Sequence, residues 1–292
     1  MKSYTTYFLV CLFTLNLFTE GYAQSSEINT SCALCKDNLH LNENPYNLDF
    51  KTEIPFILAG VGSMAFGFAM QATDNTLPFS EQELNQLDRM DVNSFDRRAT
   101  YYWDTKAQKR SDILRTGVVV LPIIFLTNHH TRSDFGSLLV MGLEIGAITY
   151  GITAGLKHTF NRTRPLAYNE NAPLEDRTSS NARLSYFSGH TSFTAAYSFF
   201  IAKVMTDYHP NMKTGYKVAI WSFSAAIPAV TGYLRVKGGR HFPTDVISGY
   251  AFGAFVGWLV PELHKKKKIS RKLTINPLFF QGAKGLYLSY RL

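Results

Sequence analysis

The sequence predicts an all-α protein, a bundle of about six core helices followed by a short C-terminal β-like hairpin. Two observations support this prediction: apolar runs of helical length alternate with polar connectors, and charged residues make up only 18% of the chain while aromatic residues reach 14%. Soluble domains usually carry about a quarter charged residues. This composition therefore indicates a dense helical core or contact with lipid, although the mean hydropathy of -0.08 is low for a chain made mostly of membrane spans.

Apolar stretches of helical length define the expected bundle. They are Pro55–Met70, Ile113–Thr127, Ser137–Leu156, Thr191–Thr206, Lys217–Leu234 and Asp245–Val260. Between the first two, Ser80-Glu81-Gln82-Glu83 has the spacing of a capping box and predicts an amphipathic helix over Leu84–Met90. After the last, Leu273–Phe280 and Leu286–Leu292 flank Gly282-Ala283-Lys284-Gly285, a pattern typical of a β-hairpin.

The first 23 residues have the pattern of a secretory signal peptide. Lys2 precedes the nearly all-apolar run Tyr7–Phe18, and Gly21-Tyr22-Ala23 places small residues where signal peptidase requires them. We therefore expect cleavage after Ala23 and export of the remaining chain.

Downstream of that cleavage site we expect three parts. Residues 24–54 form a polar leader, 55–264 a helical domain, and 265–292 a basic segment with the β-like tail. In an exported leader, Cys32 and Cys35 are expected to form a local disulfide. Two cysteines do not complete a zinc site, and no His follows Cys35, so this pair supports neither zinc nor haem binding.

The chain is basic, with a net charge of +8. Part of the excess lies in the run His264-Lys265-Lys266-Lys267-Lys268, which is either a solvated tail or a contact for anionic lipid headgroups. No module that reads nucleic acid is recognisable, so we expect no nucleic-acid partner.

Residues with chemical potential gather in three clusters. The clusters are Lys157–Pro165, Phe187–Thr191 and Arg235–Asp245. Cations at a helix end can simply favour the helix dipole, and a Ser before a helix is commonly an N-cap. The same position of Ser188 also aims free backbone N–H groups at an anion, and Gly189 allows that anion to come close.

The third cluster can also support nucleophilic chemistry. Pro243 suits the first turn of a helix, and His241 and Asp245 lie four residues apart across that helix start, so they can approach each other. An imidazole steered by a carboxylate has a fixed tautomer and a more basic far nitrogen, as a nucleophile requires.

Taken together, the three clusters resemble the motifs of the type 2 phosphatidic acid phosphatase superfamily. The matching residues are Lys157 followed after six residues by Arg164-Pro165, then Ser188-Gly189-His190, then Arg235, His241 and Asp245 at spacings of five and three intervening residues. The resemblance covers about Ser137 to Val260. Phe187 stands where the family usually has Pro, and Leu234 where it usually has Ser, which puts one hydrogen bond to phosphate in doubt.

This resemblance implies a metal-independent phosphatase. His241 would attack phosphorus and form a phosphohistidine, Asp245 would orient its ring, and His190 would protonate the leaving oxygen and then activate water. The groups that would hold the phosphoryl oxygens are Lys157, Arg164, Ser188, Gly189 and Arg235. Because cations supply the electrostatic stabilisation, we expect no cofactor, and the sequence shows no carboxylate cluster with metal-ligand spacing.

The expected substrate is a lipid phosphate or lipid pyrophosphate, of phosphatidic acid or polyprenyl type. A soluble periplasmic nonspecific acid phosphatase is the alternative. Two other classes are less favoured. A vanadium haloperoxidase shares the motifs, but the modest chain length argues against it. A phosphate-binding membrane protein without turnover is disfavoured because His190, His241 and Asp245 are intact.

The sequence leaves two arrangements open for the exported protein. If the helices span a membrane, the positive-inside rule puts Lys265–Lys268 in the cytoplasm and the active site in the periplasm. Pro55–Met70, however, would be only about 24 Å long at about 1.5 Å per residue, which is short of a hydrocarbon core of about 30 Å. A soluble or peripheral helical globule in the periplasm is the second arrangement, and no oligomeric state is predicted.

Overall fold

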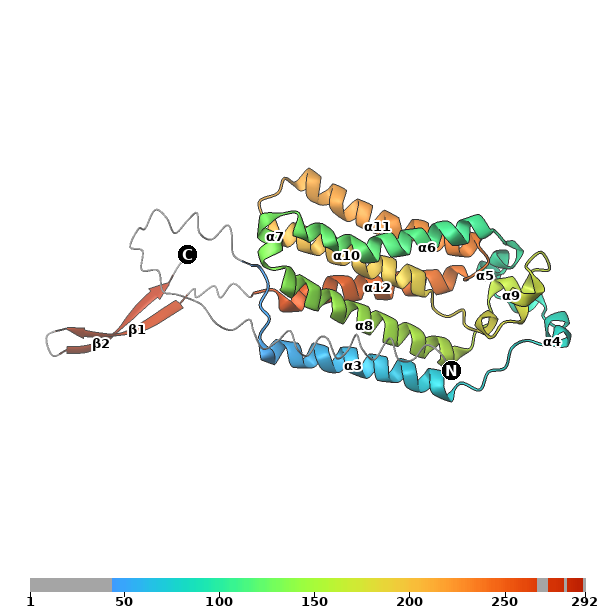
Figure 1. The fold of residues 1–292 in the computed structure, drawn as a ribbon. Coiled ribbons are helices and arrows are strands. Elements are labelled where there is room, and N and C mark those ends of the chain that lie inside the picture. Colours follow the sequence, from blue (N-terminus) through green and yellow to red (C-terminus); the bar gives the residue numbers. More distant parts are fainter. Residues whose placement is uncertain (1–43, 267–272, 281–282, 291–292) are drawn as a thin grey trace. The chain divides into compact units, whose positions relative to one another are not determined.

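The structure is a computed structural model that describes residues 44–266, 273–280 and 283–290, and it confirms the all-α prediction for the bundle (Figure 1). The long helices are α3 (Phe50–Thr73), α6 (Thr105–Val120), α8 (Phe135–Phe160), α10 (Gly189–Tyr208), α11 (Thr214–Lys237) and α12 (Pro243–His264). Short α-helices lie between them: α4 (Glu81–Asn85), α5 (Ser94–Arg97), α7 (His129–Ser133) and α9 (Leu174–Thr178). The 3-10 turns are η2 (Arg89–Asp91), η3 (Arg98–Tyr101), η4 (Leu121–Leu126), η5 (Pro165–Tyr168) and η6 (Ser180–Arg183).

The two ends of the bundle differ in their connections. At one end, called here the connector end, the long segments 74–104 and 161–188 carry α4, α5 and α9 (Figure 1). At the other, called here the terminal end, Tyr46 and Lys265 form an isolated antiparallel bridge beside the start of α3 and the end of α12. Tyr46 is 2% exposed. The compact unit therefore begins at Asn44, inside the segment that the sequence analysis assigned to the leader.

Helix α3 is longer than the sequence predicted. It begins at Phe50 instead of Pro55 and has 24 residues, or about 36 Å at about 1.5 Å per residue. The polar first turn is helical because Glu53 is buried against His264 of α12, a tertiary contact that no local pattern reveals. The argument that this helix is too short to cross a membrane is therefore wrong.

Two further boundaries differ from the sequence prediction for identifiable reasons. The capping box is present, with Ser80 and Glu83 bonding each other's backbone N–H, but α4 ends at Asn85 and the chain re-forms only a 3-10 turn at Arg89. Helix α6 begins at Thr105, where Asp104 is the N-cap, which is eight residues before the predicted start. It stops at Val120 because Pro122 cannot continue an α-helix, and η4 follows.

Small residues set the spacing between α10 and α12. A Cβ added at Gly249, Gly253 or Gly257 would lie 2.6 Å, 2.1 Å and 2.0 Å from the backbone oxygens of Ser188, Ser192 and Ala196. The two backbones therefore touch along a Gly-xxx-Gly stripe, as in closely packed membrane helices. This contact fixes the start of α10 against the first turns of α12.

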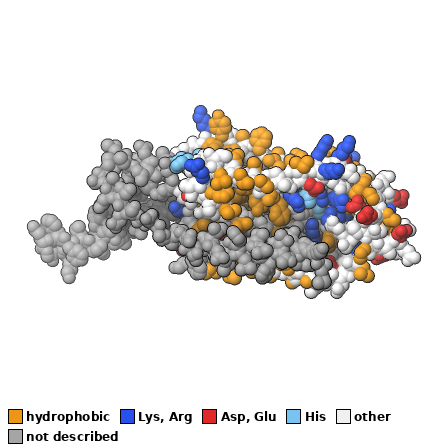
Figure 2. All heavy atoms as spheres, in the orientation of Figure 1, with side chains coloured by type: hydrophobic (Ala, Val, Ile, Leu, Met, Phe, Trp, Pro, Cys, Tyr) orange, Lys and Arg blue, Asp and Glu red, His pale blue; other side chains and the backbone are white. Residues whose placement is uncertain are grey.

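The outer surface of the bundle exposes many apolar side chains. Leu58 on α3, Ile113 on α6 and Phe223 on α11 are 66%, 71% and 71% exposed. Figure 2 shows such side chains spread over the visible face of the helices, while most of the visible Lys and Arg side chains, together with Asp and Glu, gather toward the connector end. Among the residues that the structure describes, three helical segments are long and apolar enough to cross a membrane: Glu53–Thr73, Phe135–Tyr168 and Pro243–His264. These features indicate association with a membrane.

The remaining described residues form a two-stranded antiparallel sheet of β1 (Leu273–Phe280) and β2 (Ala283–Tyr290), in which Leu273 pairs with Tyr290 and Phe280 with Ala283. Strand β2 starts at Ala283, a position that the sequence analysis assigned to the turn. The signal peptide, Cys32, Cys35 and Lys267–Lys268 lie outside the described residues.

Candidate functional site

The structure brings the three sequence clusters together at the connector end. Four helix ends meet there: the last turns of α8 and α11, and the first turns of α10 and α12. Lys157 lies on the last turns of α8, and Arg235 lies near the end of α11. The backbone N–H of Ser188 donates to the backbone oxygen of Asp245 at 3.0 Å, so the second and third clusters are in direct contact.

The start of α10 presents backbone N–H groups to this site. Ser188 is the N-cap, and its hydroxyl lies 3.4 Å from the backbone N of Thr191 and 2.9 Å from the Thr191 hydroxyl. The N-cap interpretation that the sequence allowed is therefore present, and contact with an anion stays a prediction. A Cβ added at Gly189 would lie 3.1 Å from Thr153 Cγ2 and 3.7 Å from Lys157 Nζ. Glycine therefore keeps this helix start open beside the lysine.

Two buried guanidinium groups face the same region. Arg164 is 4% exposed and donates from Nη2 to Asn181 Oδ1 at 2.8 Å and to the Leu184 carbonyl at 3.1 Å. Arg235 is 6% exposed and lies 3.3 Å from Ser111 Oγ. The Nε atoms of both arginines are buried without a hydrogen-bond partner. Because a buried donor without an acceptor is unfavourable, these groups are suited to bind an anion.

His241 lies at the centre of this arrangement and is 1% exposed. Its Nδ1 donates to the backbone carbonyl of Ser185 at 2.8 Å, which leaves Nε2 as the unprotonated nitrogen of the neutral ring. The distance from Nδ1 to Asp245 Oδ2 is 3.7 Å, beyond a normal hydrogen bond. A backbone carbonyl therefore accepts the ring proton and sets the tautomer, and Asp245, which the sequence analysis expected to orient this ring, lies beside it.

Asp245 positions the residues around His241 through other hydrogen bonds. Its Oδ2 accepts from Ser185 Oγ at 2.6 Å and from the backbone N–H of Phe242 at 2.9 Å. It therefore holds both the residue whose carbonyl orients His241 and the residue that follows His241. The carboxylate is fully buried and also accepts from Arg162 Nη1 at 2.5 Å.

Arg162 joins two buried carboxylates. Its Nη2 donates to Asp96 at 2.7 Å while its Nη1 bonds Asp245, and Asp96 also accepts from the hydroxyl of Thr244 at 2.6 Å. The sequence analysis missed Ser185, Arg162 and Asp96. Arg162 lies within the first motif cluster, but nothing in the local pattern distinguishes it from Arg164.

His190, the first-turn residue of α10, has a carboxylate partner that the sequence analysis also missed. Its Nε2 lies 2.7 Å from Asp112 Oδ1 on α6, and the same oxygen lies 3.4 Å from Arg235 Nη1. Asp112 therefore connects the proposed acid and base to a cation of the site.

Burial and the nearby cations favour the neutral form of both site histidines, while the Asp112 carboxylate opposes this effect at His190. Burial, followed by the charges of Arg164, Arg235 and Lys157, lowers the pKa of His241 well below 6.5. Burial, followed by Arg235 and Arg115, lowers the pKa of His190 as well. The nucleophile candidate consequently keeps its lone pair in mildly acidic solution.

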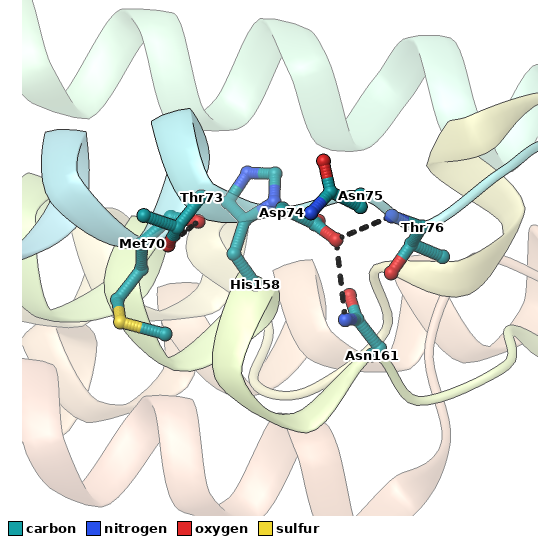
Figure 3. A pocket seen from close by; sticks show the side chains of 7 residues that line it. All are labelled: Met70, Thr73, Asp74, Asn75, Thr76, His158 and Asn161. Carbon is teal, nitrogen blue, oxygen red and sulfur yellow. Dashed lines mark hydrogen bonds and ion pairs between the residues drawn. The ribbon is translucent and has the colours of Figure 1, made fainter.

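A separate pocket of about 300 Å³ lies between the end of α3 and the end of α8 (Figure 3). His158 lines it and bonds Asp74 through Nδ1 at 2.5 Å, and Asp74 also accepts from the backbone N–H of Thr76 at 2.8 Å. None of the sequence-predicted site residues lines this pocket. His158 thus joins α8 to the residue that follows α3.

Residues 137–269 match the family model of the PAP2 superfamily, and all the motif residues fall within that range. The family resemblance is confirmed. The PAP2 segment covers α8 to α12, whereas α3 and α6 lie outside it.

A crystal structure of a transmembrane PAP2 type phosphatidylglycerolphosphate phosphatase from Bacillus subtilis is similar to this chain at 20% identity and a TM-score of 0.37, over 73% of this chain and 100% of that one. No curated protein matches this chain.

Proposed function

We propose that this protein is a phosphatase that hydrolyses a phosphate monoester or pyrophosphate of a lipid, through a phosphohistidine on Nε2 of His241. The observation that carries the proposal is the buried His241, whose neutral form is favoured beside the half-buried Lys157 and the buried guanidinium groups of Arg164 and Arg235. The positive charges of these side chains repel one another, and an anion with several oxygens reduces that repulsion best. Phosphate meets this requirement, and the match of residues 137–269 to the PAP2 family model agrees with it.

The first chemical step transfers the phosphoryl group to the protein. The lone pair of His241 Nε2 attacks phosphorus, the bond from phosphorus to the ester oxygen breaks, and His190 donates a proton to the departing oxygen. His190 must therefore be protonated in the substrate complex. The arriving phosphate dianion favours that protonation because it offsets the cations that depress the pKa in the free protein.

The second step releases phosphate. His190, now neutral, accepts a proton from water as the water oxygen attacks phosphorus, and the bond from phosphorus to His241 Nε2 breaks. Arg164 and Arg235 stabilise the charge on the equatorial oxygens in both steps. Asp245 keeps the Ser185 carbonyl and Phe242 in place, so that Nε2 stays aimed at phosphorus.

The position of the site favours a lipid substrate. The site lies where α8 ends and α12 begins, and both helices belong to segments that are long enough to cross a membrane. A lipid headgroup at the membrane surface would lie at this depth. Export to the cell envelope, with the site facing the periplasm, is part of the proposal.

The test compares substrates and locations in one experiment. Full-length protein is separated into membrane and soluble fractions, and phosphate release is measured with phosphatidic acid in detergent micelles and with a soluble nitrophenyl phosphate. We expect activity in the membrane fraction, a preference for the lipid, and inhibition by vanadate. Preference for the soluble ester would favour the acid-phosphatase alternative.

Two other outcomes would reject the proposal. Vanadate-dependent halide oxidation without phosphate release would indicate a haloperoxidase. Saturable binding of phosphate without turnover on either substrate would indicate a binding protein.

A further inference from the structure

Three ionisable side chains from three helices meet inside the bundle near the terminal end. Glu53 comes from the first turn of α3, Glu144 from α8 and His264 from the last turn of α12. Glu53 and Glu144 are each 8% exposed, and His264 is 1% exposed. This group, called here the acid triad, lies far from the proposed active site: His241 and His264 are separated by the length of α12, roughly 33 Å.

The geometry of the acid triad suits metal coordination. His264 Nε2 lies 3.0 Å from Glu53 Oε1 and 3.5 Å from Glu144 Oε2, and all three residues offer one ligand atom within 4.8 Å of the others. Ligand atoms around a tetrahedral ion with bonds of about 2.1 Å are about 3.4 Å apart. Only small adjustments would therefore place an ion between them.

The imidazole already has the arrangement of a metal ligand. His264 Nδ1 lies 2.7 Å from the backbone oxygen of Val260, to which it donates, so Nε2 points toward the carboxylates. Metal-bound histidines usually donate their other ring N–H to a carbonyl or carboxylate in this way. The ring of Phe56 stacks on His264 at a centroid distance of 4.4 Å and fixes its plane.

The carboxylates of the acid triad have few partners. Both oxygens of Glu144 are buried with no hydrogen-bond partner, Glu53 Oε1 has only His264 Nε2 beside it, and among the described residues no Lys or Arg pairs with either carboxylate. Without an ion, burial favours a proton on one of the two carboxylates, which leaves the oxygens of Glu144 unsatisfied in an apolar interior. A divalent cation in place of that proton would be balanced by two carboxylates and a neutral imidazole and would give these oxygens a partner.

We infer that Glu53, Glu144 and His264 bind a divalent transition-metal ion of the zinc class. One imidazole and two carboxylates are ligands that Zn²⁺ accepts, and a water completes the fourth position. The ion is structural: it joins α3, which lies outside the PAP2 segment, to α8 and α12 within it. It takes no part in the phosphoryl transfer at the connector end.

The test measures metal content and stability of the full-length protein, purified without a histidine tag. After incubation with zinc and dialysis, elemental analysis should find about one zinc ion per chain. The variants Glu144→Gln and His264→Gln, which keep side-chain size, should lose it. Removing the ion from wild type with a chelator should lower the thermal midpoint by about 5–10 °C. The turnover number at low temperature should be unchanged.

Three control variants separate the acid triad from other zinc ligands. Glu262→Gln changes an exposed carboxylate on the same turn of α12, His129→Gln/His130→Gln removes an adjacent histidine pair, and Cys32→Ser/Cys35→Ser removes the cysteines. Each should retain the ion.

Cobalt binding to the wild-type protein gives a second measurement that needs no triad variant. Cobalt bound to wild-type protein should show the visible absorption of a tetrahedral site, and zinc should displace it. The inference is overturned if wild type retains no zinc and no cobalt, or if folded triad variants retain as much zinc as wild type.

Discussion

The two ends of the bundle both contain buried charge, but of opposite sign. At the connector end, Lys157, Arg164 and Arg235 surround two neutral histidines, and the nearby carboxylates are already bonded to Arg162 or shared with His190. At the terminal end, two carboxylates surround one imidazole, and no Lys or Arg within residues 44–266 pairs with them. Each end therefore favours a ligand of the opposite charge, an oxyanion at one and a metal cation at the other.

The two sites differ in how far apart their residues lie in the sequence. The oxyanion site is built from three short motifs within one segment of the chain, because loop and helix-start geometry provides its contacts. The acid triad has one residue on each of three helices, more than 90 positions apart in the case of Glu53 and Glu144. Only the packing of the helices brings them together.

The largest expected effect comes from removing the nucleophile at the connector end. His241→Ala should reduce turnover by about 10⁴–10⁶-fold and abolish covalent labelling, because no other group can attack phosphorus. Acid-quenching after exposure to labelled substrate should show an acid-labile, base-stable phosphoprotein for wild type only. Equal labelling of the variant would place the nucleophile elsewhere.

The next effect concerns His190. His190→Ala should slow hydrolysis by about 10²–10⁴-fold, because it removes the acid and base. With nitrophenyl phosphate, whose leaving group needs little protonation, the variant should still label His241 and then stall. Rapid-quench measurement of phosphoprotein against product distinguishes the steps, and wild-type rates of phosphoprotein breakdown in the variant would contradict the role of His190.

A smaller effect is expected from the arginine that joins Asp96 to Asp245. Arg162→Gln leaves two fully buried carboxylates without their cation and should destabilise the protein by on the order of 3 kcal/mol. The matched control is Arg183→Gln, whose partner Glu83 is half exposed, and it should cost at most about 1 kcal/mol. Denaturant unfolding measures both, and equal costs would show that the buried network adds nothing.

The smallest effect is a pH dependence of stability. The pKa values of His190 and His241 are depressed in the folded protein, whereas the unfolded chain titrates near 6.5. Below that pH the unfolded state binds more protons than the folded state, so stability falls with a slope of up to about 1.4 kcal/mol per pH unit for each histidine. Unfolding followed from pH 7.5 to 5.5 should show this loss, and His190→Asn should reduce the slope.

The bundle and the motif positions were predictable because both are local properties of the sequence. Apolar runs gave the helices, and the spacing of Lys157, Arg164, His190 and His241 gave the candidate site. The sequence did not predict contacts between residues that lie far apart in the chain. The Ser185 carbonyl that orients His241 is 56 residues away, and its role depends on backbone geometry that no residue type encodes.

The start of helix α3 also depends on a contact between residues far apart in the sequence. Its first turn is polar by sequence and helical in the structure because Glu53 reaches a partner on α12. The carboxylates of the acid triad have no metal-ligand spacing, so sequence inspection found no metal cluster. Asp112 was equally invisible, since its interaction with His190 crosses 78 positions.

The bridge between Tyr46 and Lys265 has a consequence for the compartments that the protein faces. Asn47 N–H donates to His264 O, and Lys266 N–H donates to Pro45 O, each at 2.9 Å, so the chain enters and leaves the bundle at one place. Because the chain enters and leaves at the same place, the bundle between these two points crosses a bilayer an even number of times or not at all. Residues 44 and 266 then lie in the same compartment. If the bundle crosses the membrane, the active site, one helix length away, faces the opposite compartment. Residues 24–43 are too polar to cross a bilayer themselves. Cleavage after Ala23 and a periplasmic active site are therefore compatible only with a bundle that lies against the membrane without traversing it. A reporter fused after Leu292 should be periplasmic if the chain is cleaved and exported, and a cytoplasmic reporter would contradict that cleavage.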